Sequence, residues 1–410
     1  MVDLLFSSLA LIYFVYLLLK IRTVNHFLYH VIPFNFFIDL VQYWSFWEIM
    51  PVVRAVYFYY FFALFFFKRR TNFYDLVLII LLGYSTVLFF FSSDPGLSVR
   101  FGLRVFVALI LFSIAYRANV NRDFLIKIVS KFPAYLVCFI VYTLLSNVLG
   151  FGMVTYDDSS FITGFLFGSD LLIISFFIIF VVHYRKEISV NKYLIYGSVI
   201  ISFLILLFTL RRTTVFVVIF GVFFLNLSPK NFIKTAIPLS LILVFSSILI
   251  FQSELFQQRF QARSEKVSID SLEEELRYLE TYIVLEEIFS FEDLSKSIFG
   301  EQLFNSAGYY GNGVFGRRII HIDYWQWLNG SGILGLSIYL LLLFVIFIFY
   351  TKVKLPPKDK RLFLFLYVVQ YIISFSGQMY IISFRALIFM FMGLLLASNR
   401  KKKQSQIDSN

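Results

Sequence analysis

The stretch RRIIHIDYWQWLNGSGILG, residues 317–335, ends a long polar segment and leads directly into an apolar run. It contains His321 and Asp323, two arginines, two tryptophans and a Gly-x-x-Gly step at Gly332 and Gly335. Charged and aromatic residues beside a long apolar run are typical of the boundary between water and a lipid bilayer. The stretch therefore predicts a membrane protein with polar chemistry at one surface of the bilayer.

The composition of the whole chain points to the same environment. Of 410 residues, 60% are hydrophobic and only 15% are charged, whereas a soluble domain is about half apolar and a quarter charged. The apolar residues form repeated runs long enough to cross a hydrocarbon core of about 30 Å as helices. The single cysteine excludes an intrachain disulfide and a cysteine-based metal site. The expected fold is all-α, a polytopic transmembrane helix bundle.

The hydrophobic runs predict about 12–14 spans. They cover residues 3–19, 24–42, 52–67, 73–91, 100–116, 125–149, 161–183, 192–209, 213–227, 234–251, 327–350, 362–377 and 379–398. The predicted organisation is a bundle of about ten spans at 1–251, a long extracytoplasmic loop with short helices at 252–326, further spans at 327–398, and a disordered basic cytoplasmic tail at 399–410.

Basic loops set the expected orientation of the bundle. The tail at 400–403 and the loops at 117–127, 185–186 and 352–361 carry lysines and arginines, so we expect them on the cytoplasmic side. Counting spans from there places the long loop outside, where nearly half of the 25 acidic residues lie. A capping-box pattern at 271–274, followed by apolar residues at helical spacing, predicts an amphipathic helix of about twenty residues over the bundle.

Lysine and arginine are distributed differently across the predicted sides. Among the lysines only Lys266 and Lys296 fall outside, whereas more than half of the arginines do. A guanidinium binds phosphate or carboxylate through two parallel hydrogen bonds, so the outer side is expected to hold an oxyanion. The alternative is that these arginines pair with acidic residues, namely Asp39, Glu48, Asp94, Asp157, Asp158 and those of the long loop. The outer arginines are Arg54, Arg100, Arg104, Arg211, Arg212, Arg259, Arg263, Arg277, Arg317, Arg318 and Arg385.

Arg211 and Arg212 are the sharpest case among these arginines. They occupy a short turn between two apolar runs, and no acidic residue is near them in sequence. We therefore predict that they bind phosphate, together with Arg317 or Arg318. Contact with lipid headgroups is the alternative for the Arg211–Arg212 pair.

Asp170 is a carboxylate placed well inside the predicted span 161–183. A charged group at that depth is costly, so it marks a functional or a pairing site. Arg385 is its expected partner. A structural ion pair is the favoured interpretation, and direct contact with a substrate is the alternative.

His321 is the only one of the four histidines predicted on the outer side. An imidazole titrates near neutral pH, so His321 is a candidate general base. Asp323 could orient it only where the backbone is not helical, because positions i and i+2 of a helix point apart. The alternative is a histidine that anchors a span at the interface. Trp325 and Trp327 suit an aromatic belt, with sugar stacking as the second possibility.

These residues resemble a family. The pattern begins with His321 and Ile322, continues with nine further residues, and ends with the step from Gly332 to Gly335 at the start of a span. It is similar to the motif H-[N/S/Q]-x9-G-x-x-G. That motif closes the long periplasmic loop in the O-antigen polymerase (Wzy-type) and O-antigen ligase superfamily, and the span count and late outer loop agree. The position after the histidine is Ile322 here, where the motif has a polar residue, and this favours polymerase over ligase.

The resemblance implies a GT-C-like glycosyltransferase of the plasma (inner) membrane, with its active site facing the periplasm. The implied reaction joins oligosaccharide repeat units carried on undecaprenyl pyrophosphate, as in lipopolysaccharide or other polysaccharide biosynthesis. It needs no cofactor, no metal and no nucleic acid. The implied partners are the lipid-linked oligosaccharide, membrane lipid and a chain-length regulator protein. His321 would act as base, and Arg211, Arg212, Arg317, Arg318, Asp323, Arg385 and Asp170 would bind substrate.

Three other functions stay open on the sequence alone. A ligase would transfer the finished chain to lipid A core with the same chemistry. A transporter or flippase would move the lipid-linked sugar without joining it to another, although such proteins often contain internal repeats, which this sequence does not show. A membrane sensor or structural membrane protein is the last alternative.

Overall fold

The computed structural model describes residues 2–41, 49–66, 71–149, 171–208, 212–225, 276–311, 319–375, 377 and 380–400. Throughout these ranges every regular element is helical. The prediction of an all-α fold is confirmed for this part of the chain.

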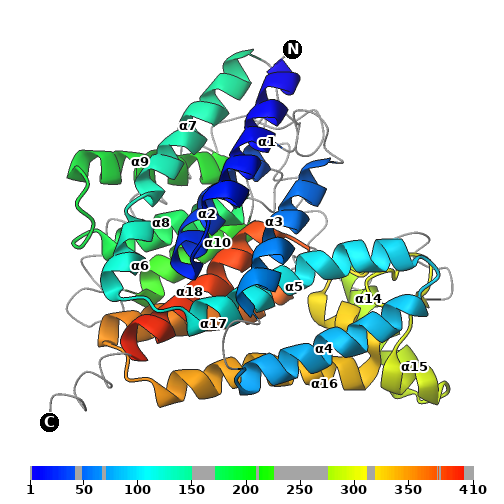
Figure 1. Cartoon of the computed structure of the whole chain (residues 1–410). Coiled ribbons are helices and arrows are strands. Elements are labelled where there is room, and N and C mark those ends of the chain that lie inside the picture. Colours follow the sequence, from blue (N-terminus) through cyan, green and yellow to red (C-terminus); the bar gives the residue numbers. More distant parts are fainter. Residues whose placement is uncertain are drawn as a thin grey trace, which may run out of the picture.

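Figure 1 shows the helices as a bundle with two small helices at one end. In chain order they are α1 (Val2–Lys20), α2 (Val24–Val41), α3 (Ile49–Phe66), α4 (Phe73–Phe90), α5 (Pro95–Arg117), α6 (Arg122–Val129), α7 (Phe132–Leu149), α8 (Leu172–Tyr184), α9 (Lys192–Phe208), α10 (Arg212–Leu225), α14 (Leu276–Phe289), α15 (Leu294–Phe299), α16 (Asp323–Lys352), α17 (Pro357–Ser374) and α18 (Ile382–Arg400).

Within the described residues, five stretches are long and apolar enough to cross a membrane: Phe73–Phe90, Pro95–Arg117, Arg122–Val148, Asp323–Lys352 and Ile382–Arg400. Several of the other described helices are apolar but shorter, among them Lys192–Phe208. Many large apolar side chains on the helices are exposed, as is normal where a surface faces lipid rather than water. Length and composition therefore indicate a membrane protein, and the predicted span 234–251 lies outside the described residues.

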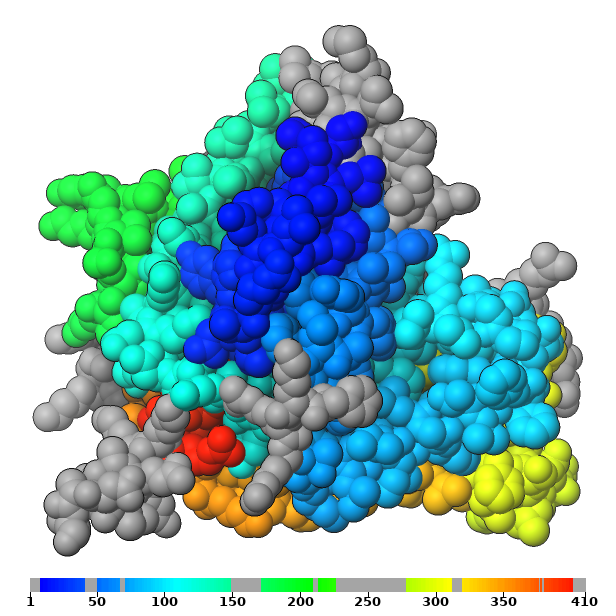
Figure 2. Space-filling model, in the orientation of Figure 1, coloured from blue at the N-terminus to red at the C-terminus, as the bar shows by residue number. Residues whose placement is uncertain are grey.

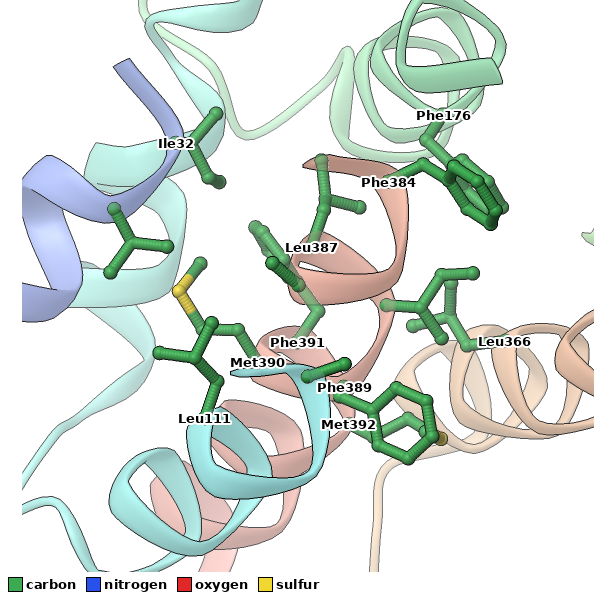
Figure 3. Packing of buried hydrophobic residues seen from close by; sticks show 14 of the residues in the cluster. Ile32, Leu111, Phe176, Leu366, Phe384, Leu387, Phe389, Met390, Phe391 and Met392 are labelled. Atoms are coloured by element: carbon green, nitrogen blue, oxygen red, sulfur yellow. The ribbon is translucent and has the colours of Figure 1, made fainter. Parts of the chain in front are cut away.

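Helix α18 is the centre of the bundle. Its side chains are buried from Ile382 to Ala397, and a helix that is apolar all round belongs in a core. It packs along α5, and also against α17, α2, α8 and α6. Figure 3 shows its side chains between Ile32 of α2, Leu111 of α5 and Phe176 of α8. In the space-filling view only its C-terminal end is visible, in red (Figure 2).

Helix α16 is long because two helices join across a kink. Its residue Gly332 has a φ of 63°, which a residue with a side chain rarely adopts. A Cβ at this position would overlap the carbonyl of Ile298 in α15. The Gly-x-x-Gly step therefore brings α15 against the bend. The hydroxyl of Tyr84 in α4 fixes both, since it donates to Phe299 O at 3.1 Å and to Ser331 O at 2.9 Å.

The helix ends form two chemically different surfaces. One holds α14, α15 and residues 300–311, and we call it the loop end (Figure 1). The other holds the first turns of α4, α6 and α17 and the last turns of α5, α16 and α18, and we call it the basic end. Ion pairs join its segments, because Arg122 contacts both Glu187 and Asp359, and Lys358 contacts Glu187. The loops expected on one side of the membrane thus meet at one end.

Helix α14 lies on α16 at the loop end, as predicted for the amphipathic helix. Val284 and Ile288 of α14 are fully buried with Tyr310, Ile320 and Leu328. The predicted capping box at 271–274 and the residue Leu272 lie outside the described residues. The described helix begins at Leu276, so about two-thirds of the predicted length is described and covers the bundle.

Candidate functional site

His321 lies at the loop end, between Ile320 and the first turn of α16. Its backbone N–H donates to Glu280 Oε1 of α14 at 2.6 Å, and the N–H of Ile322 lies 3.4 Å from the same oxygen. Glu280 is completely buried. One carboxylate oxygen therefore holds the backbone at His321 against α14.

The second oxygen of Glu280 faces the imidazole. Nδ1 of His321 lies 3.4 Å from Glu280 Oε2, and the His321 side chain is 42% exposed while that of Glu280 is 0% exposed. A carboxylate beside Nδ1 favours the tautomer with a proton on that nitrogen, and Nε2 is then free to accept a proton. The arrangement resembles the carboxylate–histidine part of a hydrolytic triad in its roles. The arrangement can orient the imidazole towards a substrate.

Sequence reasoning missed Glu280 because many glutamates surround it in the acidic loop. One signal could have found it. Glu280 is four and eight residues before Val284 and Ile288, the two residues by which α14 is buried. A carboxylate on the apolar face of an amphipathic helix needs a partner. That position distinguishes Glu280 from the exposed acidic residues of the loop.

Asp323 and Arg385 form a buried ion pair between the start of α16 and the start of α18. Asp323 is 0% and Arg385 is 5% exposed. Arg385 Nη1 also donates to Gln370 Oε1 of α17 at 3.2 Å. A buried charge is stable only when it is paired and hydrogen-bonded, so these contacts fix the three helices relative to one another.

This ion pair changes two expectations. The carboxylate that faces the imidazole of His321 is Glu280, and the Asp323 carboxylate is directed to Arg385. The partner shown for Arg385 is Asp323, whereas Asp170 was expected and lies outside the described residues. Substrate contact by Asp323 or Arg385 stays a prediction, and their burial favours a positioning role.

Gly377, which lies between α17 and α18 in the chain, contacts the backbone of His321. Gly377 has a φ of +72°, and a Cβ there would overlap the carbonyl oxygen of His321. Only glycine permits both this backbone conformation and this close approach. The contact places Gly377 directly against the backbone of the candidate base.

Polar contacts beside His321 lead from Ile320 to Tyr380, which packs on α5. Gln326 Nε2 donates to the carbonyl of Ile320, and the hydroxyl of Tyr380 donates to Gln326 Oε1. The ring of Phe101 lies 4.4 Å from the Tyr380 ring. The guanidinium carbon of Arg104, one turn further along α5, lies 5.4 Å from the centroid of the Phe101 ring. Arg104 is partly exposed, so among the described outer arginines it is a cation within reach of this region.

The remaining predicted site residues are placed less fully. Arg212 is the first residue of α10, and its side chain is not described. Arg211, Arg317, Arg318 and Asp170 lie outside the described residues. The roles of these arginines in binding pyrophosphate stay predictions. The role of Asp170 in pairing or in contact with substrate also stays a prediction.

Two further expectations were resolved. Arg54 pairs with Asp39 inside the protein, as the alternative interpretation of the outer arginines proposed. The aromatic-belt assignment is wrong for Trp327, which is fully buried and stacks on Tyr339 with 4.9 Å between ring centroids. Its neighbour Trp325 is half-buried and donates from Nε1 to Thr281 Oγ1 of α14 at 2.9 Å. Trp327 therefore belongs to the core, whereas Trp325 contacts α14 and its place in an aromatic belt stays a prediction.

Comparison with known proteins adds no relative. No protein-family model matches this chain, and no curated protein sequence matches it.

Proposed function

We propose that this protein is a polymerase of bacterial surface polysaccharide. It joins oligosaccharide repeat units carried on undecaprenyl pyrophosphate at the outer face of the plasma membrane, by glycosyl transfer that needs no metal. In this proposal the loop end faces the periplasm and the basic end faces the cytoplasm, in agreement with the positive-inside rule.

The reaction begins with proton abstraction. Nε2 of His321 takes the proton from an acceptor sugar hydroxyl of one lipid-linked repeat. That oxygen forms a bond to the anomeric carbon of the lipid-linked growing chain, while the bond from this carbon to the pyrophosphate oxygen breaks. Undecaprenyl pyrophosphate leaves with the bonding electron pair. Arginines stabilise its negative charge, and the imidazolium returns its proton to the departing phosphate or to water.

Glu280 and the arginines have separate roles. Glu280 acts as a positioning residue, because one of its carboxylate oxygens lies beside Nδ1 of the imidazole and the other accepts from the backbone N–H of His321. Arg104 is the described candidate for the pyrophosphate, and Arg211, Arg212, Arg317 and Arg318 are the candidates outside the described side chains. The ion pair of Asp323 and Arg385 stabilises the site because it fixes the starts of α16 and α18 relative to each other.

The observation that carries the proposal is the contact between His321 and the buried Glu280. A carboxylate buried against a half-exposed imidazole is costly for stability alone. It is the arrangement that a base needs when it must keep one tautomer and one orientation. The other three histidines lie in α2 and at the end of α8, towards the basic end, so this contact is specific to His321.

The test is chain extension by the purified full-length protein in vesicles that contain a lipid-linked repeat. We expect His321→Ala to reduce the rate by roughly 10²–10⁴-fold, the usual contribution of a general base. His26→Ala, a histidine at the basic end, is the matched control and should extend chains at the normal rate. Undiminished extension by His321→Ala would contradict the assignment of the base.

The acceptor separates the polymerase from the ligase. Cells that lack a polymerase attach a single repeat to lipopolysaccharide, whereas cells that lack a ligase attach none. Movement of the labelled lipid-linked repeat across the vesicle membrane without any joining of sugars would instead identify a transporter.

A further inference from the structure

A pocket at the basic end, opposite His321, has no role in the proposed glycosyl transfer. Its volume is about 610 Å³. Four long apolar helices contribute to it, through the start of α4 and the last turns of α5, α16 and α18. We call it the basic pocket, and its lining residues are Thr71, Asn72, Phe73, Tyr116, Arg117, Phe349, Lys352 and Arg400.

The charge of the basic pocket is one-sided. Its lining includes three cationic side chains and, among the described lining residues, no carboxylate. Arg117 is neutralised from behind, because its Nη1 lies 3.5 Å from Asp75 Oδ2 and its Nη2 donates to Ser113 Oγ at 3.0 Å. The other two cations face the opening, and across the described part of the chain no carboxylate is paired with Lys352 or Arg400.

An aromatic ring holds one of these two cations, Arg400, in place. The guanidinium carbon of Arg400 lies 5.0 Å from the centroid of the Tyr116 ring. This contact keeps Arg400 over the pocket instead of in bulk water. Lys352 is exposed in the last turn of α16. Arg400 and Lys352 therefore both offer hydrogen-bond donors to the same anion, and Arg400 is the one held by a ring.

The start of α4 adds little net field, because Asp75 in its first turn offsets the partial positive charge of the helix N-terminus. Helix α4 begins at Phe73, so its N-terminus, with a partial positive charge, borders the pocket. The last turns of α5, α16 and α18 carry the opposite partial charge, which a basic residue there offsets. A partial charge falls off within one turn, whereas Lys352 and Arg400 each carry a full charge. The sum at the opening stays positive.

The depth of the pocket indicates the source of the anion. It lies where four of the five long apolar helices end, which is the level of lipid headgroups. The side chain of Phe73 is 54% exposed beside it. An exposed aromatic ring next to two cations suits a ligand with a charged headgroup and an apolar chain.

We propose that the basic pocket binds a phosphate group, in the form of an anionic phospholipid headgroup. Lys352 and Arg400 contact the phosphate oxygens, Thr71 and Asn72 line the polar wall, and Phe73 contacts the start of the acyl chains. The site is separate from the glycosyl-transfer site, so its existence does not depend on the proposed function.

The experiment is lipid titration of the full-length protein, purified in detergent, with bound lipid counted by native mass spectrometry. The probes are phosphatidylglycerol and phosphatidylcholine. The test variant is Lys352→Gln with Arg400→Gln. The matched control is Lys354→Gln with Lys360→Gln, which removes two exposed lysines at the same end that do not line the pocket. All variants keep the basic residues at 68–70 and 401–403.

We expect phosphatidylglycerol to bind the natural protein and the control variant equally, and the test variant on the order of 20-fold more weakly, about fivefold for each cation. Equal loss in both variants would overturn the site, because it would mean that only the net charge matters. Equal binding of phosphatidylcholine to the natural protein would also overturn it.

A third arm separates the two sources of phosphate. Phosphatidylglycerol that stays bound in a large excess of inorganic phosphate supports the lipid as the ligand. Inorganic phosphate could instead displace the lipid from the natural protein but not from the residual sites of the test variant. That result would support a phosphate site and would contradict the proposal that a lipid is its ligand. All of the substituted side chains are exposed, so equal melting temperatures of the variants are expected throughout.

Discussion

The two ends of this helix bundle differ in the charge that they expose. At the loop end the carboxylates of Glu280 and Asp323 are fully buried, and each holds one specific partner. At the basic end cations outnumber carboxylates, and several of them, including Lys352 and Arg400, face outward. Buried pairs fix geometry because their partners have no alternative in water. Exposed cations keep the freedom to meet lipid, solvent or ligand.

The largest effect should come from breaking the buried pair at the loop end. Asp323→Asn leaves the charge of Arg385 buried without its partner, and we expect a loss of about 3–5 kcal/mol in the free energy of unfolding. Denaturant unfolding in detergent measures it. The double variant Asp323→Asn with Arg385→Gln removes both charges and should recover a large part of the loss. A single variant as stable as the natural protein would show that the two ends do not differ in this way.

A smaller effect is expected from the backbone contact over His321. Gly377→Ala places a Cβ on the carbonyl of His321 and forces alanine into a left-handed conformation, at a cost of about 1–3 kcal/mol. Chain extension should fall together with stability, because the imidazole is displaced. Gly83→Ala is the matched control, since nothing lies within 4 Å of a Cβ there, and it should leave both measurements unchanged.

The Glu280 contact can be tested without loss of the fold. Glu280→Gln keeps an oxygen that accepts from the backbone N–H of His321, but its amide donates and therefore favours the wrong tautomer of the imidazole. We expect kcat to fall roughly tenfold, about 1.4 kcal/mol, with KM unchanged. Glu280→Asp should restore part of kcat. A change confined to the melting temperature would reduce Glu280 to a structural role.

The smallest effect belongs to the basic end. Partial burial raises the pKa of Glu187, but hydrogen bonds and positive charge from Lys358 and Arg122 outweigh it and hold the pKa below its ordinary value. Because the pKa is lower in the folded state, the stabilisation is fully present above the unfolded value of about 4.3 and is lost as pH falls through the folded value. The cluster is partly solvated, so we expect less than about 1 kcal/mol.

Melting temperatures at pH 7 and pH 4 measure this contribution. Glu187→Gln should lower the melting temperature at pH 7 and should narrow the difference between the two pH values. Glu292→Gln is the control, because Glu292 is exposed and lies at the loop end. If the difference in melting temperature narrowed equally in both variants, the pH dependence would not come from the ion pairs of Glu187 at the basic end.

Local patterns in the sequence were enough to predict most of the described helices and to single out His321 as a candidate. Apolar runs of sufficient length give helices in a membrane because the backbone must satisfy its own hydrogen bonds there. The capping box of Asn72 and Asp75 and the Asp94–Pro95 pair mark the beginnings of α4 and α5 by contacts within three residues. The basic loops indicated which segments share one end, because charge near a span end follows one rule along the whole chain.

The partners of the charged groups were decided only by the tertiary structure. Glu280 lies 41 residues from His321, and Asp323 lies 62 residues from Arg385. The nearest candidate in sequence, Asp323 for His321, was not the carboxylate that faces the imidazole. Tryptophan is a residue typical of a membrane interface, yet Trp327 is buried, because the rings of Phe106, Phe304 and Tyr339 surround it. Pairing across such distances depends on how helices pack, and packing is a property of all of their faces together rather than of any one stretch.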